Sequence, residues 1–192
     1  MYGVPNTSQS KPPDLIVPLG YGLTKNDQLP EIEKQILAYA ALFIPNEETK
    51  VAWASSSYFF QGSAAYEDAL KHKFLLAYVR HGLGTPVVGG GVTNSVTEAE
   101  AISLTLQKEG VSAPKHILVV CDWAHARSVR IIWRHFFPEA RISTHSVEGV
   151  WEPSHRGKFQ GSNAVWFLAC VARHVALRVL GVKWVGNFRQ PT

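Results

Sequence analysis

The sequence predicts one layered α/β domain with a mostly parallel central sheet of about five strands. Short apolar segments alternate with stretches in which apolar residues recur at helical spacing, and the connections between them are short. Residues 115–121 form a continuous apolar run, which is typical of a strand covered on both faces. Strands that alternate with helices imply right-handed crossovers and therefore parallel pairing.

We expect strands at residues 15–19, 50–54, 85–88, 115–121 and 141–144. We expect helices at residues 30–43, 64–81, 97–109, 124–137 and 163–180. Pro30 suits a first helical turn, while Gly82 and Gly110 suit helix ends. The loop 146–162 is long for a compact domain, which favours a lid or a binding loop.

The composition indicates a single core. The chain has 192 residues, of which 46% are hydrophobic, enough for one well-buried domain. We expect a flexible arm at residues 1–13 and one domain at 14–192. The net charge of +4 favours anionic ligands. Lys and Arg are scattered and form no basic stripe, so nucleic acid is not the expected partner.

Several features predict a cytoplasmic protein without a transmembrane anchor. Cys121 and Cys170 lie in apolar runs without CxxC spacing, which fits a reducing compartment. Residues 1–13 lack the apolar core of a signal peptide. Helix 163–180 carries Arg173 and Arg178, which disfavours a membrane span and leaves two interpretations, packing on the sheet or lying on a membrane surface. The oligomeric state stays open.

Two strand-to-helix segments carry the polar residues, at 88–101 and 119–127. Their strand ends belong at one edge of a parallel sheet, where open α/β folds bind ligands. In the first, we expect Gly89–Gly91 to form a turn. That turn either lets a ligand approach a helix N-terminus or only meets a need for tight geometry. The run matches neither GxGxxG nor a P-loop.

The residues after these glycines begin a helix. Thr93, Asn94, Ser95 or Thr97 can each be the N-cap, and Thr97 with Glu100 resembles a capping box. That pattern leaves Glu98 available to face the crevice, where a carboxylate could hold a ligand or orient a histidine.

The second segment places three ionisable residues close together. Asp122 follows an apolar strand and is either functional or a helix cap. His125 can exchange a proton near neutral pH, and Arg127 can form two parallel hydrogen bonds with a carboxylate or phosphate. Arg130 and Arg134 continue the helical spacing as a solvated face. The sequence has no GxSxG elbow and no zinc-ligand spacing, so no metal is predicted.

The same segments resemble the YdcF-like family, which includes the SanA and ElyC proteins. Its counterparts here are Leu19-Gly20, the segment Asn94-Ser-Val-Thr-Glu98, and His125-Ala-Arg127, and the likeness extends over residues 14–145. The chain departs from the family pattern in two places. Ser55-Ser-Ser57 replaces a Ser-Gly-Gly strand end, and Lys34-Gln35 stands where an arginine is expected.

The resemblance implies a three-layer Rossmann-like fold and S-adenosylmethionine or a nucleotide-like compound as ligand. Glu98 and His125 are the acid–base candidates. The candidate ligand-binding residues are Gly20, Ser55, Gly90, Asn94, Ser95, Asp122 and Arg127.

Three functions remain open. The first is a small-molecule-binding α/β protein, as an enzyme on an anionic or nucleotide-like compound. The second is a non-catalytic, envelope-related regulator that uses Trp166, Phe167 and Trp184 to contact a protein or membrane. The third is a hydrolase or transferase on an anionic substrate, for which the sequence identifies no nucleophile.

Overall fold

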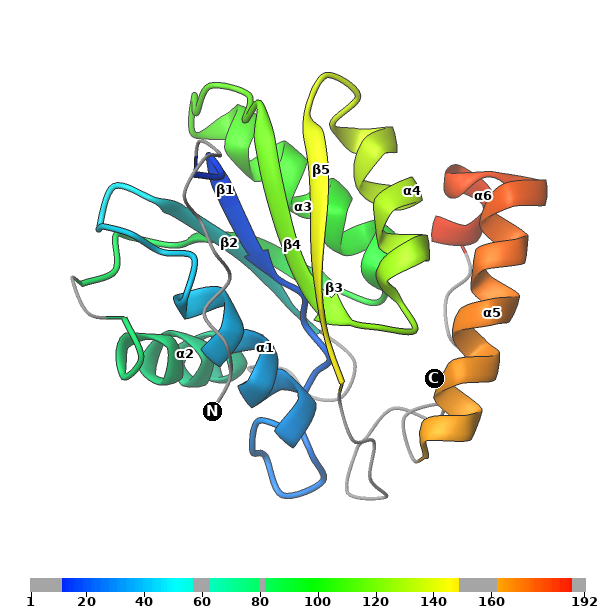
Figure 1. Cartoon of the computed structure of the whole chain (residues 1–192), viewed down its shortest axis with the longest axis horizontal. Helices are drawn as coiled ribbons and strands as arrows, with labels where there is room; N and C mark the ends of the chain where they lie inside the picture. Colours follow the sequence, from blue (N-terminus) through cyan, green and yellow to red (C-terminus); the bar gives the residue numbers. More distant parts are fainter. Residues whose placement is uncertain (1–11, 57–62, 80–81, 149–161, 188–192) are drawn as a thin grey trace.

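Five parallel strands form the centre of the protein in the order β3-β2-β1-β4-β5 (Figure 1). The computed structural model describes residues 12–56, 63–79, 82–148 and 162–187. The strands are β1 (Leu15–Pro18), β2 (Lys50–Ser56), β3 (Val87–Val92), β4 (His116–Asp122) and β5 (Arg141–Val147). The helices are α1 (Glu31–Ala41), α2 (Ser63–Leu76), α3 (Ser95–Lys108), α4 (Ala126–Phe136), α5 (Asn163–Leu180) and α6 (Val182–Gly186).

The helices cover both faces of this sheet. α1 contacts β1, β4 and β5, and α2 contacts β2; α3 and α4 pack on the opposite face (Figure 1). α5 lies alongside α4, away from the sheet, and α6 contacts α3 and α4. The protein therefore has the parallel sheet that the alternation of apolar segments predicts and the three-layer Rossmann-like fold that the resemblance implies.

The strand order reverses between β1 and β4, at the carboxyl edge of the sheet. From β1 the chain moves outward through β2 to β3, and it then returns to place β4 and β5 on the other side of β1. β1 and β4 are neighbours in register, with Ile16 beside Leu118 and Pro18 beside Val120. Connections leave these two strand ends in opposite directions, which is the arrangement that opens a ligand-binding crevice in open α/β sheets.

The expected turn at Gly89–Gly91 is wrong, because β3 continues through these residues, with an irregularity in its pairing to β2 between the pairs Ala54–Gly89 and Ser56–Val92. Gly89 lies where α3 approaches the sheet closely. A Cβ on it would stand 3.1 Å from the Ala54 Cβ and 3.3 Å from the Ala101 Cβ. A Cβ on Gly90 would meet nothing within 4 Å. The first glycine thus permits close packing of helix on strand, and the run forms no loop around a ligand.

Two helix ends also differ from expectation. α3 begins at Ser95, and its capping box joins Asn94 to Thr97, so the expected pairing of Thr97 with Glu100 is wrong. α2 ends at Leu76, and hydrogen-bonded turns continue to Val79, where the sequence predicts helix to residue 81. Helix α6 has no counterpart in the sequence-based prediction. The expectations for residues 1–11, Ser57 and most of the loop 146–162 lie outside the described residues.

Candidate functional site

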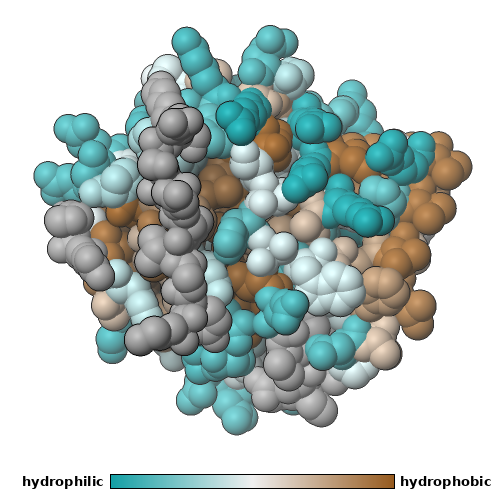
Figure 2. Space-filling view, in the orientation of Figure 1, coloured by the Kyte–Doolittle hydropathy of each residue, from teal (hydrophilic) through white to brown (hydrophobic). Residues whose placement is uncertain are grey.

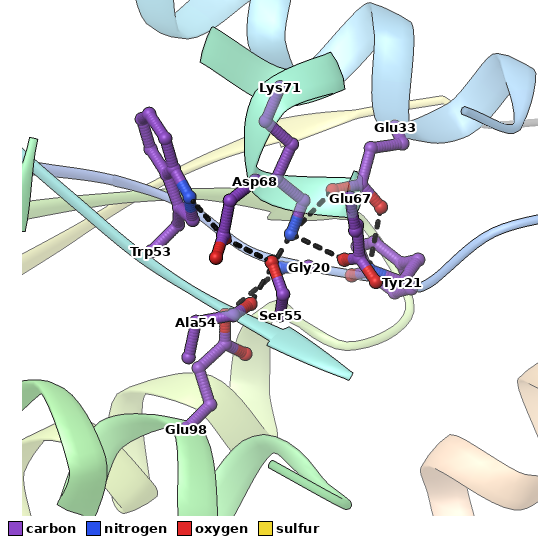
Figure 3. A network of polar contacts seen from close by, with 10 residues as sticks. All are labelled: Gly20, Tyr21, Glu33, Trp53, Ala54, Ser55, Glu67, Asp68, Lys71 and Glu98. Atoms are coloured by element: carbon purple, nitrogen blue, oxygen red, sulfur yellow. Dashed lines mark hydrogen bonds and ion pairs between the residues drawn. The ribbon is translucent and has the colours of Figure 1, made fainter. Parts of the chain in front are cut away.

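Two groups of buried polar side chains meet at the carboxyl edge of β1 and β4, and the dipeptide Gly20-Tyr21 joins them. The first group, the histidine cluster, contains Tyr21, Ser95, Asp122, His125, Trp166 and Arg173. The second, the charge cluster, contains Glu33, Glu67, Lys71 and Glu98 (Figure 3). Both groups draw residues from widely separated parts of the chain.

Asp122, the last residue of β4, organises the histidine cluster. Its Oδ1 accepts hydrogen bonds from the backbone amides of Ala124 at 3.0 Å and His125 at 3.2 Å, and from Trp166 Nε1 at 3.0 Å. Its Oδ2 accepts from the Tyr21 hydroxyl at 2.5 Å. Burial raises the pKa of Asp122, and these donors counter that effect. Asp122 therefore both caps the turn into α4 and positions Tyr21.

His125 is a buried, neutral imidazole. Arg173 Nη1 lies 2.9 Å from its Nε2, and a guanidinium can only donate, so Nε2 is an acceptor. The proton then belongs on Nδ1, which lies 3.5 Å from the Tyr21 hydroxyl. Burial and the nearby charge of Arg173 hold the pKa of His125 well below its usual value. The side chain is therefore uncharged at neutral pH, and its acceptor nitrogen, Nε2, is engaged by Arg173.

Ser95 also lies within hydrogen-bond distance of His125 Nε2. As the first residue of α3, it places its Oγ 3.3 Å from His125 Nε2. Its position depends on Asn94, whose Oδ1 accepts from the amides of Val96 at 2.9 Å and Thr97 at 3.1 Å. A partly exposed hydroxyl thus faces the acceptor nitrogen of a neutral histidine.

Arg173 enters the cluster from α5. Its guanidinium lies 5.5 Å from the ring centroid of Trp166, a cation–π contact. Trp166 in turn packs edge-on against His125 and Tyr21 at centroid distances of 5.8 Å. Among the described residues, no carboxylate forms a salt bridge with Arg173. The cluster therefore contains a partly exposed cation without a matching anion.

The charge cluster surrounds one buried ammonium. Lys71 Nζ lies 3.1 Å from Glu33 Oε1, 2.7 Å from Glu67 Oε1 and 3.2 Å from the Ala54 carbonyl oxygen (Figure 3). An ammonium has three hydrogens, so these three acceptors satisfy it. Burial lowers the pKa of Lys71, but Glu33 and Glu67 raise it by more, and the side chain stays charged.

Two of the surrounding carboxyl groups hold the loop that follows β1. Glu98 Oε1 accepts from the Gly20 amide at 3.1 Å, and Glu33 Oε2 accepts from the Tyr21 amide at 2.7 Å. Burial raises the pKa of Glu98 to about 8 and that of Glu33 to about 7, against the opposing charge of Lys71. Glu98 is therefore mostly protonated at neutral pH and is already bonded to the backbone.

The structure brings together some of the predicted site residues. Ser95, Asp122 and His125 meet in the histidine cluster, and Gly20 lies directly over the charge cluster. A Cβ on Gly20 would stand 2.9 Å from Lys71 Nζ and 3.0 Å from the Ala54 carbonyl oxygen. A residue with a side chain would therefore collide with these atoms, which is why the position requires glycine.

Other predicted site residues lie outside these two clusters or cap a helix. Ser55 donates to Asp68, whose carboxylate also accepts from Trp53 Nε1. Arg127 is exposed on α4, and Gly90 faces open space on β3. Asn94 caps α3.

Sequence reasoning missed Tyr21, Arg173 and Lys71, and its placement of Trp166 on an outer contact surface is wrong, because Trp166 is buried and bonds to Asp122. Tyr21 lies between two glycines after the first strand, and Glu67 and Lys71 stand four residues apart on α2, but neither pattern reveals burial. Arg173 in an otherwise apolar helix was the most usable signal.

Within the described residues, no group of three His, Cys, Asp or Glu side chains is arranged to hold a metal ion. No family model matches the chain, and no curated protein or solved structure matches it.

Proposed function

We propose that this chain is a cytoplasmic YdcF-like protein that binds an anionic, nucleotide-like small molecule at the carboxyl edge of β1 and β4. The place of the histidine cluster supports this proposal, because open α/β sheets bind ligands where the strand order reverses. The resemblance over residues 14–145 supports the family and the ligand class.

The observation that carries the proposal is the Arg173 cation at this edge, which pairs with no carboxylate among the described residues. Arg173 is partly exposed, and among the described residues its hydrogen bond is to the neutral His125 and its ring contact is with the face of Trp166. A carboxylate or phosphate can form two parallel hydrogen bonds with a guanidinium. The carboxylate of S-adenosylmethionine and the phosphates of nucleotides both meet this requirement.

The Gly20 amide is already engaged by Glu98, so it offers no donor to this ligand. Anion binding therefore depends on Arg173, with Arg127 as the alternative that the sequence predicts. An anion that draws Arg173 away from His125 would also leave Nε2 free to accept a proton. Ligand binding and the exposure of a base are thus coupled at one nitrogen.

A second candidate, a hydrolase or transferase on an anionic substrate, is favoured by the Ser95 Oγ to His125 Nε2 distance of 3.3 Å. With Arg173 on the substrate anion, Ser95 Oγ would attack the electrophilic carbon or phosphorus and transfer its proton to His125 Nε2. The leaving group would depart with that proton, and water or an acceptor hydroxyl would then release the group from Ser95. Tyr21 and Asp122 would orient the imidazole.

A thermal-shift screen tests the binding proposal. The compounds are S-adenosylmethionine, its demethylated product, nucleotides and sugar nucleotides, and at least one should raise the Tm because a ligand stabilises the state that binds it. Arg173→Gln should abolish the shift, while Arg127→Gln should retain it. If Arg173→Gln kept the shift in Tm and Arg127→Gln lost it, Arg127, the residue that the sequence predicts, would be the anion-binding arginine. No shift with any compound would reject the proposal.

Turnover of the stabilising compound separates the two candidates. An enzyme that uses Ser95 should lose about 10²-fold or more of its kcat in Ser95→Ala, as removal of a catalytic group does. Ser103→Ala on the same helix is the matched control, because Ser103 lies outside the histidine cluster. Binding without turnover would leave ligand binding as the function and would reject the hydrolase or transferase.

A further inference from the structure

The outward side of α5 is a continuous apolar surface. Trp166, Cys170 and Leu177 point inward and are buried. The exposed apolar residues, which together we call the outer face, are Val165, Phe167, Leu168, Val171, Val175, Val179 and Leu180. These are seven of the fifteen large apolar side chains that the described part of the chain exposes, so the exposure is concentrated on one helix. Figure 2 shows the corresponding apolar area along the right-hand edge of the molecule.

This surface extends beyond the helix itself. Trp123, exposed after β4, stacks on Phe167 at a centroid distance of 5.5 Å, and Trp184 is exposed on α6. Leu168 and Val179 are 65% and 74% exposed, although burial of either would be favourable. Contiguous exposed apolar surface of this kind marks a site of contact with a protein or a membrane.

The charges around the outer face are of one sign. Residues 162–187 contain Arg173, Arg178 and Lys183 and no Asp or Glu. Arg178 and Lys183 are exposed, and the neighbouring helix α4 adds the exposed Arg127 and Arg134. An apolar helix face with cations beside it is the pattern of helices that lie in the interface of an anionic bilayer.

Two other occupants fit less well. A second copy of the chain would place Arg178 and Lys183 against the same cations, without a carboxylate from this segment to balance them. Length and composition would allow α5 to cross a membrane, and 17% of it is buried in the structure. However, its inner row packs on the domain and Arg173 bonds to His125, which holds the helix along the domain surface.

We infer that the outer face of α5 docks on the surface of an anionic lipid bilayer. The apolar side chains enter the boundary between headgroups and acyl chains, while Arg178 and Lys183 contact the anionic headgroups. The inner face keeps Trp166 and Arg173 on the histidine cluster, so docking leaves the candidate site assembled. This contact goes beyond the proposed function and depends on different residues.

Co-sedimentation of the full chain with vesicles tests the inference. Vesicles of phosphatidylglycerol and phosphatidylcholine should bind the protein, pure phosphatidylcholine should bind it more weakly, and high salt should reduce the difference. The double variant Leu168→Asp/Val175→Asp should lose at least about tenfold in affinity, because it places two charges in the apolar boundary. The matched control, Leu42→Asp/Leu104→Asp, changes two leucines that are similarly exposed, at the C-cap of α1 and on α3, and should bind as the wild type does.

A second variant removes charge and leaves the apolar face intact. Arg178→Glu/Lys183→Glu should weaken binding to phosphatidylglycerol vesicles and leave the weaker binding to phosphatidylcholine unchanged. Three results would overturn the inference: no sedimentation with anionic vesicles, equal binding by both double Asp variants, or a dimer in solution that Leu168→Asp/Val175→Asp dissociates. Ligand-induced thermal shifts of the same variants, measured without vesicles, report separately on the proposed function.

Discussion

The histidine cluster and the charge cluster share one sheet edge but differ in how completely their charges are satisfied. Lys71 is fully buried, and three acceptors take its three hydrogens. Arg173 is partly exposed, and within the described residues it has no carboxylate partner. A closed, satisfied group supports the backbone, whereas an open group with an unmatched cation can bind a ligand.

The largest difference is expected on removing the central cation of the charge cluster. Lys71→Met leaves three carboxyl groups buried without their cation, which should lower the free energy of unfolding by about 3–5 kcal/mol. Urea unfolding at pH 7 measures the loss. Lys73→Met, at an exposed position on the same helix, should change stability by less than about 0.5 kcal/mol. Equal effects of the two variants would show that the charge cluster is not a structural support.

A smaller loss is expected from Gly20→Ala. The added methyl group would collide with Lys71 Nζ and the Ala54 carbonyl oxygen, and overpacking of this kind costs about 1–3 kcal/mol. Gly90→Ala is the matched control, because a Cβ there meets nothing within 4 Å. Thermal unfolding compares the two. A Gly20→Ala protein as stable as the control would mean that the loop after β1 can move away from Lys71.

The charge cluster should also make stability depend on pH. Folding raises the pKa of Glu98 from its ordinary value of 4.5 to about 8, so between these pH values the folded state holds a proton that the unfolded chain releases. The free energy of unfolding therefore falls as the pH rises through this range. Glu98→Gln cannot ionise, and at pH 9 it should be about 4–5 kcal/mol more stable than the wild type, since each pKa unit of the shift corresponds to about 1.4 kcal/mol.

Urea unfolding at pH 5 and pH 9 checks this difference. Glu100→Gln, at an exposed position on the same helix, should follow the wild type at both pH values. A wild-type protein whose stability does not fall over this range would contradict the buried, protonated state of Glu98.

The smallest effect on stability is expected in the histidine cluster. Arg173→Gln removes a cation that lowers the pKa of His125, so the pKa of His125 should rise. Stability should change by less than about 1 kcal/mol, because the guanidinium is partly exposed. A titration of the His125 ring by NMR measures the pKa, with Arg178→Gln as the control. An unchanged pKa of His125 in Arg173→Gln would show that Arg173 does not lie beside His125 in solution.

Much of the fold was predictable from local patterns. The continuous apolar run at 115–121 indicated a central strand, and β4 covers 116–122. The helix predicted at 163–180 has these bounds in α5. The spacing of apolar residues predicts such elements, because burial of one or both faces requires apolar side chains at regular positions along the segment. Asp122 and His125 were recognisable for a similar reason, since they directly follow that strand.

The parts that the sequence alone could not determine depend on contacts between distant residues. The glycines at 89–91 are compatible with a turn or a strand, and pairing with β2 decided for the strand, where Gly89 lies close to Ala54 of β2 and Ala101 of α3. Arg127 lies beside His125 in sequence, yet Arg173, 48 residues away, is the arginine that reaches it. Lys71 and the three carboxyl groups of the charge cluster come from three different helices. The sequence by itself determined the alternation of strands and helices, whereas only tertiary packing decided which charges are neutralised and which remain open.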